Sequence, residues 1–226
     1  MQIADSLREM IMTGELKEGD RINENELCAT MGISKTPLRE ALRVLGGEGL
    51  ISLVPNRGSF VTKPTIQEIK EMFEVMSVLE GVCARAATMK MNPAEFAAIQ
   101  NLHDKLEKEF ERRDQKKYIH INNRYHAFIQ ELAGNRTLNQ IVNGLRKKIL
   151  MYRFQSLSLS GRFDDSIKEH RELLAAFRER NALKAEKIMK LHLIRQSAAL
   201  EKLAAEVEDG QSVPKKDPQP QTQREA

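Results

Sequence analysis

Beyond residue 64, apolar positions recur at the three- and four-residue spacing of long amphipathic helices. Breakers such as Asn92-Pro93 and Gly134-Asn135 interrupt this pattern and separate one helix from the next. The predicted helices span residues 65–89, 93–113, 115–133, 136–157, 163–180 and 182–208. After Asp209 the chain is rich in Gln, Pro and Lys and loses its apolar period, which predicts a disordered tail over residues 209–226.

The first 64 residues show a different pattern. A short helix is predicted over residues 24–31, Gly32 allows a sharp turn, and Ser34 can cap a second helix behind it. The apolar face of that second helix consists of Leu38, Ala41, Leu42 and Leu45. Short apolar runs at 49–54 and 59–62 flank a Pro-Asn-Arg-Gly turn and predict a hairpin with Arg57 at its tip.

These elements define the predicted fold class. It is mainly α, with an N-terminal winged helix-turn-helix over residues 1–64 and a C-terminal all-α six-helix bundle over residues 65–208. The second short helix carries Lys35, Arg39 and Arg43 on the side opposite its apolar face, where a DNA groove could receive them. An ordinary solvated face would look similar, but the Arg at the wing tip makes that alternative the weaker one.

Charge supports this reading through its placement and not through its sum. The whole chain has a formal charge of +4, yet residues 1–64 hold eight Lys or Arg against nine Asp or Glu. No apolar run approaches the roughly 20 residues of a membrane span. The N-terminus lacks the apolar core of a signal peptide, so we expect a cytoplasmic protein.

Three histidines of the helical part lie beside apolar stripes on three different predicted helices. They are His126, with Asn122 one turn before it, His170 and His192. Three neutral imidazoles and one oxygen ligand suit Zn²⁺, Ni²⁺ or a similar divalent ion. A histidine on an apolar helix face is more often a core residue, so the spacing alone leaves both readings open. The other two bundle histidines, His103 and His120, fit no such pattern and are expected at the surface.

The N-terminal motifs have a known counterpart. Residues 14–62 resemble the DNA-binding domain of the GntR family of bacterial transcription regulators, through Gly19-Asp20-Arg21-Ile22, the run Gly32–Leu42, Glu48-Gly49-Leu50 and Arg57-Gly58-Ser59. Lys35 stands where the family usually has Arg, which keeps the charge but loses the bidentate fork. The expected DNA contacts are Lys35, Thr36, Arg39, Arg43, Arg57 and Gly58.

Residues 65–208 resemble the FCD ligand-binding domain of the FadR branch, through Leu79-Glu80, Tyr125-His126, Gly134-Asn135, Glu169-His170 and His192. Six helices indicate the VanR-like subgroup. The resemblance implies that Asn122, His126, His170 and His192 bind a divalent metal, with Asn122 replacing the usual Asp. It also implies an organic acid as effector. The usual Arg anchor is replaced by Met76, and Arg153 is a second candidate anchor, with a surface charge as the alternative.

The resemblance implies a homodimeric transcription regulator, a repressor in the commoner case, that binds a palindromic double-stranded operator and responds to a small metabolite. It implies no enzymatic activity. Two alternatives come from the histidines themselves. The helical domain could be a metal-dependent enzyme, although no carboxylate is clearly placed as a general base and no nucleophile motif appears. It could also be a metal-free ligand-binding domain, with DNA binding secondary.

Overall fold

The computed structural model describes residues 2–208, so the predicted tail over 209–226 lies outside the described residues. The N-terminal part is a winged helix-turn-helix, as expected. Its elements are α1 (Gln2–Thr13), α2 (Glu24–Met31), α3 (Lys35–Gly47), β1 (Ile51–Val54) and β2 (Gly58–Val61). The two strands are antiparallel and pair Ile51 with Val61, which leaves the turn at the tip of the wing.

Local chemistry explains the boundaries of the short helices. The side chain of Asn23 caps α2, and Gly32 ends it at a φ of 64°, a left-handed conformation that glycine adopts without strain. Ser34 occupies the N-cap position of α3 as predicted, but its side chain makes no capping hydrogen bond. The expected apolar face of α3 is buried against α1, because Leu38, Ala41, Leu42 and Leu45 are all core residues.

The C-terminal part consists of six helices within residues 66–208, so the predicted fold class is confirmed. They are α4 (Ile66–Lys90), α5 (Pro93–Glu111), α6 (Gln115–Ala133), α7 (Arg136–Leu157), α8 (Arg162–Arg178) and α9 (Ala182–Glu208). Capping boxes at Thr65 and Asn92 begin α4 and α5, and left-handed Gly134 ends α6. The ends of α5 and α8 come two residues earlier than predicted, before Arg113 and Arg180, which have positive φ values.

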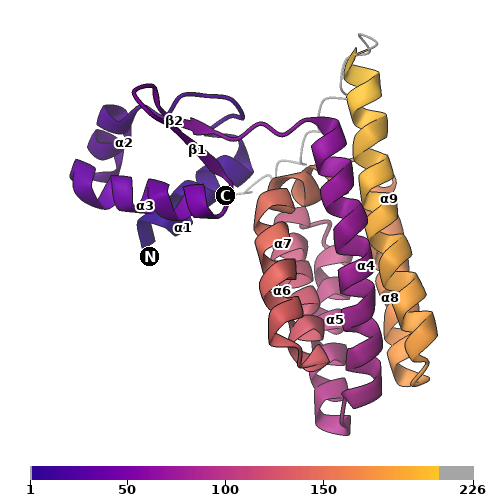
Figure 1. The fold of residues 1–226 in the computed structure, drawn as a ribbon. Helices are drawn as coiled ribbons and strands as arrows, with labels where there is room; N and C mark the ends of the chain where they lie inside the picture. Colours follow the sequence, from indigo (N-terminus) through magenta and orange to yellow (C-terminus); the bar gives the residue numbers. More distant parts are fainter. Residues whose placement is uncertain (1, 209–226) are drawn as a thin grey trace, which may run out of the picture.

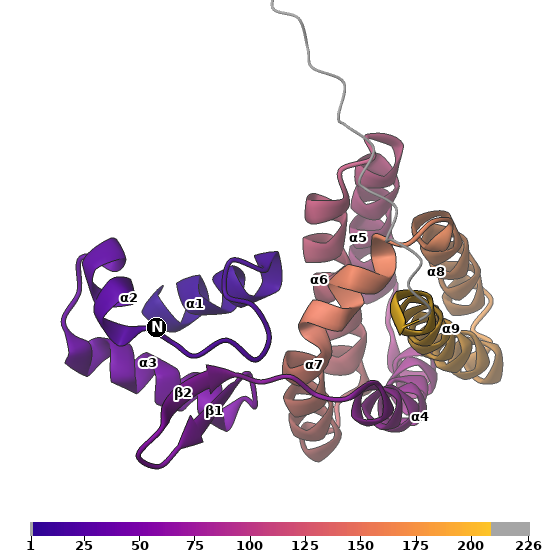
Figure 2. The same ribbon diagram turned by 90° about the horizontal axis from the view of Figure 1, so that it is seen from above.

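The helices α4 and α9 run side by side along the bundle (Figure 1). Seen from above, α7 lies on the side of the bundle that faces the winged helix-turn-helix (Figure 2). An apolar core continues across this junction, because Leu7 and Ile11 of α1 belong to the same buried cluster as Ile149 of α7 and Phe73 of α4. The two parts are therefore packed together and not merely tethered. No helix among the described residues is long and apolar enough to cross a membrane.

Candidate metal centre and nucleic-acid interface

The side of α3 that faces away from the core is polar and exposed. Lys35, Thr36, Arg39 and Arg43 all lie on this exposed side. Two of them form ion pairs within the domain. Arg39 Nε lies 2.8 Å from Glu24 Oε2, and Arg43 Nη1 lies 2.6 Å from Glu40 Oε1. These arginines are 60% and 69% exposed, and exposed pairs contribute only about 0–1 kcal/mol, so a DNA phosphate could displace them.

The wing lies beside this helix. Arg57 is exposed at its tip, and Gly58 follows it at a φ of 98°. A Cβ at Gly58 would make an ordinary contact with Arg21 Nε at 3.4 Å, so a larger residue would be disfavoured there by the positive φ. A groove between α3 and the wing is lined by Arg39, Arg43, Asn56 and Gly58, among others. Glu24 also lines this groove, so the surface combines exposed arginines with the carboxylate that pairs with Arg39.

Three histidines meet in the interior of the bundle. His126 comes from α6, His170 from α8 and His192 from α9, and each is at most 2% exposed. One ligand nitrogen from each lies within 4.8 Å of the others, and the ring centroids are 4.9–5.4 Å apart. The histidines that the sequence placed on three apolar stripes thus converge on one point.

Two buried carboxylates orient these rings. His126 Nδ1 lies 2.6 Å from Glu80 Oε2, and His192 Nδ1 lies 2.6 Å from Glu169 Oε2. A ring that donates its Nδ1–H to a carboxylate keeps a lone pair on Nε2, which is the form that binds a metal. His126 Nε2 and both ring nitrogens of His170 have no hydrogen-bond partner, whereas His192 Nε2 lies 3.0 Å from the amide nitrogen of Gln196.

Burial keeps these imidazoles neutral. It lowers the pKa of His126 to about 3 against the opposing charge of Glu80, and it also lowers the pKa of His170 and His192. Asn122 is 1% exposed, one turn before His126, and its Oδ1 has no partner. Three neutral imidazoles, of which His126 and His170 have unpaired nitrogens, and one unpaired amide oxygen fit a divalent ion such as Zn²⁺ or Ni²⁺.

Arg153 is buried, so its interpretation as a surface charge was wrong. It is 1% exposed, and its Nη1 lies 3.4 Å from Glu80 Oε1. Arg146 Nη1 lies 3.1 Å from the same oxygen. Burial, reinforced by the charge of Arg146, lowers the pKa of Arg153 to about 9. Burial alone would raise the pKa of Glu80, but His126, Arg146 and Arg153 together hold it well below its usual value.

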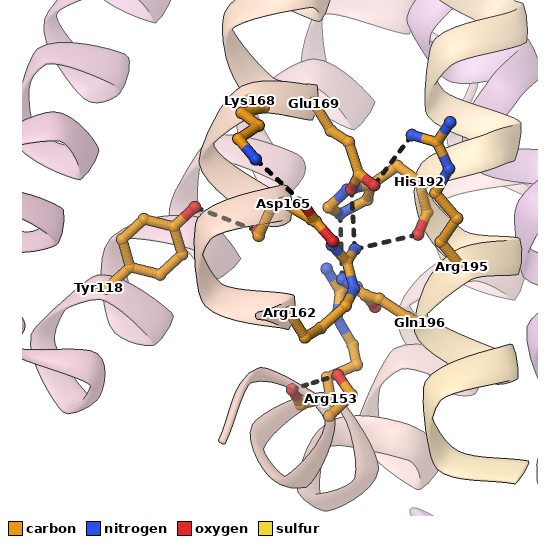
Figure 3. A network of polar contacts seen from close by, with 11 residues as sticks. Tyr118, Arg153, Arg162, Asp165, Lys168, Glu169, His192, Arg195 and Gln196 are labelled. Atoms are coloured by element: carbon orange, nitrogen blue, oxygen red, sulfur yellow. Dashed lines mark hydrogen bonds and ion pairs between the residues drawn. The ribbon is translucent and has the colours of Figure 1, made fainter. Parts of the chain in front are cut away.

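A second buried network joins α8 to α9 (Figure 3). Arg162 Nη2 lies 2.8 Å from Glu169 Oε2, and Arg195 Nη1 lies 3.1 Å from Glu169 Oε1. Burial opposes the ionised form of Glu169, but His192 and Arg162 outweigh it and lower its pKa to about 2. Glu169 projects away from its neighbour His170, as helix geometry requires, and contacts the histidine of the next helix instead.

Several residues of this centre were not singled out from the sequence. The sequence did not predict Arg146, Arg162 or Gln196 as members of this centre. It drew attention to Glu80 only as part of the resemblance to the FCD domain. Local signals were the seven-residue spacing between Arg162 and Glu169, the four-residue spacing between His192 and Gln196, and the position of Glu80 on the apolar stripe of α4. Met76, at the position of the missing anchor, is completely buried.

His103 and His120 behave differently from each other. The expectation of a surface position was wrong for His103, which is 4% exposed and packs edge-on against Tyr125. The amphipathic face of α5 turns it inward between apolar neighbours. His120 is exposed as expected.

Comparisons with known proteins match each part of the chain to a protein family. The family model "Bacterial regulatory proteins, gntR family" matches residues 1–61, and the "FCD domain" model matches residues 71–195. The HTH-type transcriptional regulator YdhC of Bacillus subtilis is 24% identical over 182 residues, which cover 80% of this chain and 81% of that protein. The HTH-type transcriptional repressor RspR of Escherichia coli is 24% identical over 209 residues, which cover 92% of this chain and 91% of the repressor.

Solved structures share the arrangement of both parts. Escherichia coli McbR/YncC superimposes with a TM-score of 0.76 at 22% identity, over 90% of this chain and 97% of that one. A GntR regulator from Rhodococcus sp. RHA1 gives a TM-score of 0.70 at 20% identity, over 90% and 97% of the two chains. At these identities the likeness establishes a common fold.

Proposed function

Because the chain belongs to the GntR family of bacterial regulatory proteins and carries its FCD domain, we propose that a small organic acid and a divalent metal control its binding to DNA. The chain is a DNA-binding transcriptional regulator and not an enzyme, since its domains and relatives are regulators. The observation that carries the proposal is the convergence of three neutral, buried histidines on one point.

The metal would be held by His126, His170, His192 and the amide oxygen of Asn122. When bound, it supplies a positive charge on which an anionic ligand can be anchored. Glu80 and Glu169 hold the histidine rings in place through their Nδ1 atoms. Arg153 would add a second buried positive charge beside the metal and would serve as an anchor for the acid. The neutral side chain of Asn122 favours the second candidate, a metal-free pocket for the same class of ligand.

At the DNA, Lys35, Thr36 and Arg39 would contact base edges or nearby phosphates, while Arg43 and Arg57 position the protein on the backbone. Gly58 lets the wing approach the duplex closely. The boundary that we assign to this domain is residue 64, with the effector domain over residues 65–208.

A homodimer would place its two winged helix-turn-helix domains, the heads of the molecule, on the two half-sites of a palindromic operator. The described residues offer a surface for dimerisation, because Val75 and Val78 of α4 and Leu191 and Ile194 of α9 are 37–50% exposed. These helices lie side by side. We place the regulator in the cytoplasm, where the bacterial chromosome lies.

The contacts of α7 support a route by which effector binding could change the position of the winged helix-turn-helix domain. Arg146 and Arg153 extend from it into the bundle. On its other side, Lys147 Nζ lies 2.8 Å from Glu48 Oε1 at the end of α3, and the Tyr152 hydroxyl contacts Glu18. A ligand that favours one position of α7 would therefore favour one arrangement of the heads. We propose that the protein is a repressor and that the ligand releases it from DNA.

The first test is selection of DNA sites from a random pool with untagged protein, before and after chelation. An enriched inverted repeat is expected, with an affinity that changes on chelation. Enrichment that is identical after complete metal removal would favour the metal-free pocket. Absence of any enriched site in both conditions would contradict the assigned DNA contacts.

A further inference from the structure

The buried charges around the histidine centre do not balance. Three guanidinium groups are at most 9% exposed there, those of Arg146, Arg153 and Arg162. Two buried carboxylates face them, Glu80 and Glu169, and an imidazole that binds a metal ion is neutral. Among the described residues, the centre therefore has one positive charge in excess before any metal ion is counted. A buried charge without a counterion is strongly unfavourable.

Both carboxylates are fully used. Glu80 accepts from His126 with one oxygen and from Arg146 with the other. Glu169 Oε2 accepts from His192 and Arg162, and its Oε1 accepts from Arg195. No oxygen of these two side chains is left without a donor, and neither carboxylate contacts the Nε or Nη2 atom of Arg153.

Arg153 offers a complete binding edge for such a counterion. Its Nε and Nη2 atoms, which point to the same side of a guanidinium, have no hydrogen-bond partner although the side chain is 1% exposed. Arg162 Nε and Nη1 are also unpaired. Figure 3 shows the side chain of Arg153 reaching from α7 toward Arg162 and Gln196, whose Oε1 is unpaired too.

Another pair in this protein shows what such an edge binds. Arg171 uses Nε and Nη2 to hold the two oxygens of Glu107 at 2.7 Å and 2.6 Å. The free edge of Arg153 has the same two donors and no carboxylate. Its geometry therefore suits a bidentate carboxylate of a ligand.

We infer that the effector is an acid with at least two anionic groups, one bound by the Nε–Nη2 edge of Arg153 and one directed at the histidine centre. This inference rests on the proposed function of the same site. One carboxylate would compensate only the guanidinium excess. A divalent ion held by three imidazoles and the Asn122 amide would then keep its full charge, because none of its protein ligands is anionic.

The experiment compares diacids with monoacids of equal carbon number. Untagged full-length protein loaded with Zn²⁺ is titrated calorimetrically with malonate against propionate, succinate against butyrate, and glutarate against pentanoate. In at least one pair, the diacid is expected to bind more than about 10-fold tighter, the ratio typical of one additional charge-assisted contact. If no diacid binds more tightly than its monoacid partner, the inference is wrong.

Three variants locate the effect. Arg153→Lys keeps the buried charge but removes the bidentate edge, so the diacid preference should fall at least about fivefold. Arg171→Lys is the matched control, because it removes the same bidentate edge from a half-exposed arginine outside the centre, and it should keep the preference. Asn122→Asp adds a negative charge to the metal ligands and should lower the preference while zinc is retained. An unchanged preference in Arg153→Lys would overturn the inference.

Zinc content and affinity for the selected operator are measured on the same preparations. A protein that binds operator and zinc but prefers monoacids contradicts the diacid inference alone. A protein that binds no zinc contradicts the proposed metal centre, and the acid titrations on that sample then report only on Arg153.

Discussion

The arginines of the DNA-facing surface and those of the bundle interior have the same chemistry in opposite surroundings. Arg39 and Arg43 are 60% and 69% exposed, and each is paired with a glutamate on the surface. Arg153 and Arg162 are buried and keep unpaired N–H groups. Water screens the first pair, so these side chains are available to any phosphate. Arg153 and Arg162 are not screened in this way, so an anion that binds them, as we propose, would be selected by geometry as well as by charge.

The largest difference between the two regions should appear when one carboxylate is neutralised in each. Glu80→Gln leaves Arg146 and Arg153 buried without their counterion and should cost about 3–5 kcal/mol of unfolding free energy. Glu24→Gln, which removes the surface partner of Arg39, should cost less than about 1 kcal/mol. Denaturant unfolding measures both, and equal costs would mean that the interior is hydrated.

Removal of a histidine tests the centre itself. His126→Ala should lower the affinity for Zn²⁺ by more than about 100-fold, because even the loss of an outer partner of a ligand costs roughly 10–100-fold. His120→Ala is the matched control, since His120 lies on the same helix but is exposed. Competition with a chromophoric chelator measures the affinity. Equal affinities in both variants would remove His126 from the ligand set.

Two arginines with different assigned roles provide a test of the DNA-facing surface. Arg39→Ala should cost about 1–3 kcal/mol on the selected operator and relax its sequence preference. Arg57→Ala should weaken binding to all sequences alike and reduce the salt slope by about 1. Binding to operator and to random duplex is measured over a range of salt concentrations. A selective loss of operator binding in Arg57→Ala would exchange the two roles.

The smallest effect is expected at the junction between the regions. Lys147 and Arg8 outweigh the burial of Glu48 and lower the pKa of its carboxyl group. Because this pKa is lowered on folding, the stabilisation by Glu48 is present above the ordinary value of about 4.3 and is lost as the pH falls below it. The melting temperatures of the wild type and Glu48→Gln should differ at pH 7 and converge in acid.

The same variant reports on α7. If α7 transmits the effector signal, Glu48→Gln should also weaken the change in operator affinity that the acid produces. An unchanged response would assign the Lys147–Glu48 pair to packing alone.

Much of this architecture could be read from local chemistry. Gly32, Gly134 and the capping residues Thr65 and Asn92 set the ends of helices, because their backbone conformations and hydrogen bonds involve only residues within one turn. The exposed face of α3 follows from helical periodicity in the same way. The convergence of His126, His170 and His192 was open to prediction because each lies beside an apolar stripe, and apolar stripes pack inward.

The partners of those histidines were decided by packing between distant segments. Glu80 lies 46 residues from His126 and 73 from Arg153. Its position between Met76 and Cys83 on the apolar stripe of α4 indicates burial, but it does not indicate these partners. Arg153 could be taken for a solvated charge until the structure shows it buried against Glu80 of α4. His103 could be taken for exposed until α5 turns it inward. Periodicity says which face of a helix is buried. Which charged groups meet behind that face, and whether their charges balance, depends on how the helices are arranged around them.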